Sequence, residues 1–189
     1  MTSTTPPTAR RLAVAIPLLL LSYGVLRLID GMDGSHGPGV AWNLGHTCFL
    51  GAFLLLGLLV VRLRSRVPAA SLSRRVATET ATGAGLFGAA CFVWVILGDL
   101  APALPALPGP LRLVGPLCFQ LALLALLTML AAARHVPART PALTALAFVL
   151  ITVDLDLLPA AALALLAAFA PLTHTPAAAR PPRVTALTR

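Results

Sequence analysis

The chain has 189 residues, of which 58% are hydrophobic and only 11% are charged, whereas soluble domains are about 45–50% apolar and about 25% charged. This composition excludes a disordered chain, a small disulfide-stapled protein and an ordinary soluble enzyme, and it predicts an integral membrane protein. The net charge of +8 comes from 14 arginines and no lysine. Because the arginines cluster at the ends of apolar runs, we expect them to orient the chain in a lipid bilayer, and we expect no nucleic-acid partner.

The first apolar run, residues 12–29, follows a polar segment and two arginines. Residues 1–9 are rich in Thr and Pro, and we expect them to form a disordered tail. No small-residue cleavage site follows the run, and more apolar runs come after it. The run is therefore predicted to be a membrane-spanning helix rather than a signal peptide.

Three further runs approach the length of a membrane span, which is about 20 apolar residues. They cover residues 44–61, 77–97 and 111–133. Asn43 and Thr78 are predicted to lie at the N-caps of the second and third helices, because such side chains accept hydrogen bonds from free backbone amides. Pro110 suits the start of the fourth helix, where no amide donor is needed.

The last apolar stretch, residues 141–172, is 32 residues long. As one helix it would measure about 48 Å against a hydrocarbon core of about 30 Å. Asp154 and Asp156 would then lie near the bilayer centre, at a cost of about 3 kcal/mol each. We therefore predict two short helices, 141–157 and 158–173, with Asp156 capping the second. The fold class is an all-α polytopic membrane bundle of six helices, with five as the alternative.

The arginine distribution favours six helices and a cytoplasmic N-terminus. In that arrangement 12 of the 14 arginines lie on the side of the N-terminus, and five helices would leave the three arginines of the C-terminal tail on the opposite side. The positive-inside rule therefore places both termini in the cytoplasm. Residues 10–173 are the predicted bundle, and residues 174–189 are a predicted disordered tail. The Lys-free, Ala- and Arg-rich composition indicates a bacterial plasma membrane, in an actinobacterium.

The first outer loop carries a possible metal or ligand site. Asp30, Asp33 and His36 recur every third residue, and His46 follows at the start of the second helix. Carboxylate and imidazole groups together bind divalent transition metals. The alternative is a plain turn with an interfacial anchor at Trp42. No haem or other cofactor is predicted.

A second outer cluster is predicted from three further acidic residues. These are Asp99, Asp154 and Asp156. Arg27 and Arg112 are their expected counter-charges, and Arg27 is also spaced to pair with Asp30 on one helix face. The alternative is a set of separately solvated loop charges.

Small residues follow the third helix at steps of four, in two adjacent stripes. The first stripe is Thr80, Ala84 and Gly88, and the second is Ala81, Gly85 and Ala89. Small residues at this spacing let helix backbones approach closely. We expect this helix to be central in the bundle, with a homodimer face as the alternative.

Two polar side chains inside the predicted helices have structural interpretations. Gln120 lies deep in the fourth helix and is predicted to form an interhelical hydrogen bond, with Thr152 at a similar depth. Glu79 lies near the start of the third helix, where a carboxylate complements the helix dipole. It is also predicted to pair with Arg74 or Arg75.

No catalytic motif is present, and the sequence predicts no enzyme. It contains no GxSxG, HExxH or P-loop pattern, and its three cysteines show no metal-binding spacing. Three functions remain as alternatives. They are a structural, regulatory or partner-binding role, a transporter for a cation or small amphiphile, and a metal-binding redox component. The bilayer is the expected partner, and a protein partner or a second copy of the chain is left open.

Overall fold

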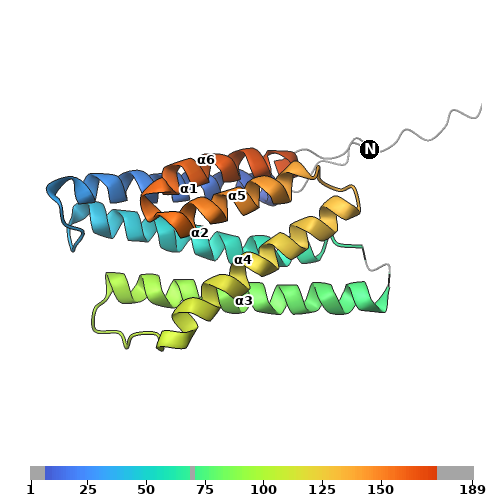
Figure 1. The fold of residues 1–189 in the computed structure, drawn as a ribbon, viewed down its shortest axis with the longest axis horizontal. Coiled ribbons are helices and arrows are strands. Elements are labelled where there is room, and N and C mark those ends of the chain that lie inside the picture. Colours follow the sequence, from blue (N-terminus) through green and yellow to red (C-terminus); the bar gives the residue numbers. More distant parts are fainter. Residues whose placement is uncertain (1–6, 69–70, 174–189) are drawn as a thin grey trace, which may run out of the picture.

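The computed structural model describes residues 7–68 and 71–173, and the side chains of all of these except residues 7–9 and 33. Within these ranges the chain forms six α-helices and no strand (Figure 1). They are α1 Pro7–Asp30, α2 Val40–Arg64, α3 Leu72–Leu100, α4 Gly109–Ala132, α5 Arg139–Val153 and α6 Leu158–Phe169. Short 3-10 turns follow α1, α5 and α6 at Gly31–Asp33, Leu155–Leu157 and Ala170–Thr173. Helix α1 begins three residues before the predicted boundary of the bundle, and the predicted C-terminal tail lies outside the described residues.

The outer surface of the bundle is apolar on every helix. Five helical segments are long and apolar enough to cross a membrane, and α5 is a shorter apolar helix. Each helix carries a large apolar residue whose exposed fraction lies between 44% and 65%. These residues are Leu18, Leu54, Phe87, Leu121, Val149 and Leu163. Such a surface is typical of contact with lipid and not with water. The chain is therefore a multi-pass helical membrane bundle, which confirms the predicted fold class.

The last apolar stretch is divided, as predicted, by a turn at Asp154. The Asp154 carboxylate accepts a hydrogen bond of 2.9 Å from the Asp156 amide and so closes the turn. Asp156 does not cap α6, because it lies within this turn and the helix begins at Leu158. Helix α5 has 15 residues, or about 22 Å, so its passage requires local thinning of the bilayer.

Two predicted helix starts are wrong by about one turn or more. The residue before α2 is Gly39, so Asn43 lies inside the first turn. Helix α3 is capped by Ser71, whose hydroxyl accepts from the amide three residues later at 3.2 Å, and Thr78 is buried within the helix. Helix α3 extends beyond its apolar run because the segment 72–76, which includes Ser73, Arg74 and Arg75, continues the helix into the membrane interface. Pro110 lies in the first turn of α4, as predicted.

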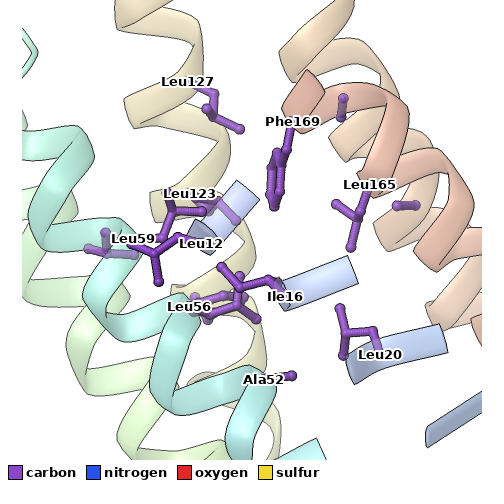
Figure 2. Close-up of a cluster of buried hydrophobic side chains, with 14 of the residues drawn as sticks. Leu12, Ile16, Leu20, Ala52, Leu56, Leu59, Leu123, Leu127, Leu165 and Phe169 are labelled. Atoms are coloured by element: carbon purple, nitrogen blue, oxygen red, sulfur yellow. The ribbon is translucent and has the colours of Figure 1, made fainter. Parts of the chain in front are cut away.

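The helices pack in chain order, and α6 returns to contact α1. The shared core lies between α1, α2, α4 and α6, where Ile16 and Leu56 are surrounded by Leu123, Leu165 and Phe169 (Figure 2). Helix α4 crosses α3 at a steep angle, whereas α1, α2, α5 and α6 run nearly parallel or antiparallel (Figure 1).

The crossing of α3 and α4 depends on a glycine in each helix. A Cβ on Gly88 would lie 2.6 Å from the Phe119 nitrogen and would also meet the Gly115 carbonyl. The two backbones are therefore in contact at this point. Of the predicted stripes, four residues are buried, namely Gly88, Ala81, Gly85 and Ala89. Thr80 is exposed and Ala84 is half-buried.

Candidate ligand site at the acidic end

Acidic residues from three connections meet at one end of the bundle. We name the acidic end by its described carboxylates Asp30, Asp99, Asp154 and Asp156. Arg27 Nε lies 3.1 Å from Asp156 Oδ1 and joins the end of α1 to the α5–α6 turn. Arg27 therefore pairs with one of the three outer carboxylates for which it was an expected counter-charge, and not with Asp30. Asp30 instead accepts a hydrogen bond of 3.2 Å from the Gly37 amide, which closes the α1–α2 loop.

His46 connects α2 to α3 within this end and is only 4% exposed. Its Nδ1 lies 2.9 Å from the Trp42 carbonyl oxygen, and its ring packs 4.0 Å from the Trp42 ring. Because a carbonyl oxygen only accepts, Nδ1 carries the proton in this contact. Nε2 lies 3.5 Å from Asp99 Oδ2, to which it donates only when the ring is protonated.

The predicted metal residues are not gathered in the described part of the chain. His46 is turned toward Asp99, and the exposed His36 ring packs beside Gly31. Among the described side chains, no three His, Cys, Asp or Glu residues are placed to hold a metal ion. The side chain of Asp33 lies outside this description.

A pocket of about 530 Å³ lies between the last turns of α3 and the first turns of α4. The two helices touch at Gly88, and they diverge from this crossing toward the acidic end (Figure 1), which leaves room for the pocket. Asp99 and Arg112 line it, and its apolar floor includes Cys91 and Pro116. No ion pair joins Arg112 to Asp99 or to another described carboxylate.

The α3–α4 loop, residues 101–108, covers this pocket and is held in place by hydrogen bonds. The Trp94 indole donates to the Pro105 carbonyl at 2.9 Å, and Arg112 Nε donates to the Leu107 carbonyl at 3.1 Å. Residues 101–110 include four prolines, each of which fixes one backbone dihedral. The pocket is therefore largely preformed, which lowers the entropic cost of binding.

Asp99 and Arg112 were predicted as members of an outer charge cluster, but the pocket between them was not predicted. A local signal was present, because four prolines within ten residues stand between Trp94 and Arg112. Such a proline-rich, apolar connection at a membrane interface indicates a loop with a fixed conformation. The packing angle of α3 on α4, which gives the pocket its volume, has no comparable signal.

The middle of the bundle is closed by packed phenylalanines. The ring of Phe53 lies 4.0 Å from that of Phe92 and 5.4 Å from that of Phe119. A cavity of about 70 Å³ remains beside them, and among the described residues Gln120 is the one polar side chain that lines it. Gln120 has no hydrogen-bond partner among the described residues, so its predicted interhelical bond is not formed there, and Thr152 donates to the carbonyl of Phe148 in its own helix.

At the opposite end, Glu79 pairs with a different arginine from those expected. Both carboxylate oxygens accept from Arg64 of α2, at 2.7 and 2.8 Å. This bidentate contact joins α2 to α3 beside the short connection between them. Comparison of the chain with protein-family models, with curated proteins and with solved structures finds no match.

Proposed function

We propose that this chain is a small binding protein of the bacterial plasma membrane, which takes an amphiphile into the pocket between α3 and α4. The observation that supports this proposal is the pocket itself. Its volume of about 530 Å³ falls within the range of about 300–1,000 Å³ that is usual for small-molecule sites. Its lining is mostly apolar with two opposite charges, as an amphiphile requires.

The surroundings of the pocket favour a ligand that enters from the membrane. Trp94 and Val95 line it and are 44% and 37% exposed on the lipid-facing surface. The other tryptophan, Trp42, lies at the same end and donates to the Asp99 carbonyl at 3.4 Å. Tryptophans concentrate at the level of lipid headgroups. The acidic end would then face outside the cell, since most arginines lie toward the other end.

A binding or regulatory role is favoured over transport through the bundle. Phe53, Phe92 and Phe119 fill the interior at mid-depth, where a carrier would need a polar path. The chemistry that the geometry supports is recognition at one membrane face, with the bilayer as the partner.

The proposal is tested by a substitution that places a large side chain in the pocket. Gly98 lines it, and nothing lies within 4 Å of a Cβ built there. Gly98→Phe should therefore occupy the pocket without forcing helices apart. Gly83→Phe is the matched control, because Gly83 lies on the same helix, exposed, with the same open space around its Cβ.

The purified protein would be incubated in detergent with three single-chain lipids, which carry a neutral, a zwitterionic and an anionic headgroup. Native mass spectrometry, in which the detergent is removed in the instrument, would then measure the fraction of protein that retains each lipid. We expect the wild-type protein and Gly83→Phe to retain at least one of them as a one-to-one complex. Gly98→Phe should lower the retained fraction at least tenfold. Equal retention by Gly98→Phe and the wild type, or no retention by the wild type, would overturn the proposal.

A further inference from the structure

Two opposite charges border the pocket without neutralising each other. Asp99 Oδ2 faces His46, and its other carboxylate oxygen has no hydrogen-bond partner in the described part of the chain. The Asp99 side chain is 42% exposed. Arg112 is anchored through Nε on the Leu107 carbonyl, which leaves its two terminal nitrogens as donors. A bound molecule therefore meets one cationic and one anionic group.

We propose that the ligand is a zwitterionic phospholipid of the phosphatidylethanolamine type, with its phosphate on Arg112 and its ammonium on Asp99. This inference rests on the proposed function and names its ligand class. A guanidinium presents paired donors that match phosphate oxygens, and a carboxylate accepts charge-assisted hydrogen bonds from an ammonium. A purely anionic headgroup would instead face the Asp99 carboxylate, and a purely cationic one would face Arg112.

The depth of the pocket favours a lipid over a free headgroup. Its lining extends along α3 from Asp99 to Cys91, which is about 12 Å for eight residues of helix. Phe92 and Pro116 make this deeper part apolar. The charged groups lie at the interfacial level, and the apolar part leads toward the bilayer beside the exposed Trp94. A phospholipid matches this change from charged to apolar lining, with its glycerol backbone and the start of an acyl chain against the apolar residues.

The test is a competition between lysophosphatidylethanolamine and lysophosphatidylglycerol for the detergent-purified full chain, read as the ratio of the two bound species. We expect the wild type to prefer the zwitterionic lipid by about tenfold, the effect of one charge-assisted hydrogen bond. Asp99→Asn should abolish this preference, and Arg112→Gln should weaken both lipids. Asp30→Asn is the matched control, since Asp30 does not line this pocket, and it should retain the wild-type ratio.

A second variant separates ligand contact from a role of Asp99 in folding. His46→Gln removes the partner of Asp99 but keeps its carboxylate, so it should retain the preference for the zwitterionic lipid. Equal binding of both lipids by the wild type, or an unchanged ratio in Asp99→Asn, would overturn the inference. The proposed function would still stand if Gly98→Phe lost both lipids. Free phosphoethanolamine should not displace the lipid at equal concentration, and displacement would overturn the assignment to a lipid.

Discussion

Replacing Gly88 with alanine is expected to destabilise the bundle by about 3 kcal/mol, the upper part of the range for overpacked sites. The added Cβ would lie 2.6 Å from the Phe119 nitrogen and 2.7 Å from its Cβ. Two of its nearest contacts are backbone atoms, which cannot move aside as the end of a flexible side chain can. The two helices must therefore separate, which also alters the pocket beyond their crossing. The measurement is the midpoint of thermal unfolding in mild detergent, followed by size-exclusion chromatography.

Gly83→Ala supplies the comparison on the same helix. Nothing lies within 4 Å of a Cβ at Gly83, which is exposed. Alanine is a better helix former than glycine by about 0.5–1 kcal/mol, so this variant should unfold at the wild-type temperature or slightly above it. If both alanine variants unfolded together, the close backbone contact at Gly88 would be refuted.

Replacing Phe119 with alanine is expected to cost about 3–4 kcal/mol, as for other large buried aromatic side chains. Phe119 is 2% exposed, and its ring contacts those of Phe53, Phe92 and Phe148 at 5.4, 5.9 and 6.3 Å. It thereby connects α4 to α2, α3 and α5. Lost dispersion contacts are not recovered in lipid, because the site is closed by protein. The same unfolding assay measures this loss.

Leu121→Ala distinguishes packing from hydrophobicity. Leu121 is two residues away on α4 and is 65% exposed on the lipid side. Lipid tails are as apolar as leucine, so removing this side chain should change the unfolding midpoint little. A cost equal to that of Phe119→Ala would mean that this face of α4 is covered by protein rather than by lipid.

The sequence was sufficient for the fold class and for the division of the last apolar stretch. Apolar run length and the cost of burying Asp154 and Asp156 act locally, so they can be evaluated without coordinates. Helix starts were less predictable, because Ser71 caps α3 six residues before the apolar run begins. A polar segment at a membrane interface continues a helix as readily as it forms a loop.

Two ion pairs predicted from spacing along the chain, Arg27 with Asp30 and Glu79 with Arg74 or Arg75, are not formed, whereas Arg27 does pair with one of the outer carboxylates for which it was an expected counter-charge. Arg27 reaches Asp156, 129 residues away, and Glu79 reaches Arg64 on the preceding helix. Both contacts arise from the packing of neighbouring helices. The spacing of residues along one helix gives no information about such contacts. The same limit applies to the pocket, since Gly88 signals a close approach but not the crossing angle.

The most direct test of this account is the side of the membrane on which the α5–α6 turn lies. Single cysteines at Val153, Ser35 and Ser73 would be introduced into a chain without its own three cysteines. An impermeant maleimide is then applied to intact cells. Val153, which is 73% exposed beside the Asp154 turn, should be labelled as fully as Ser35, whereas Ser73 should react only after the membrane is permeabilised. Protection of Val153 in intact cells, with labelling of Ser35 retained, would contradict an acidic end shared by all three connections.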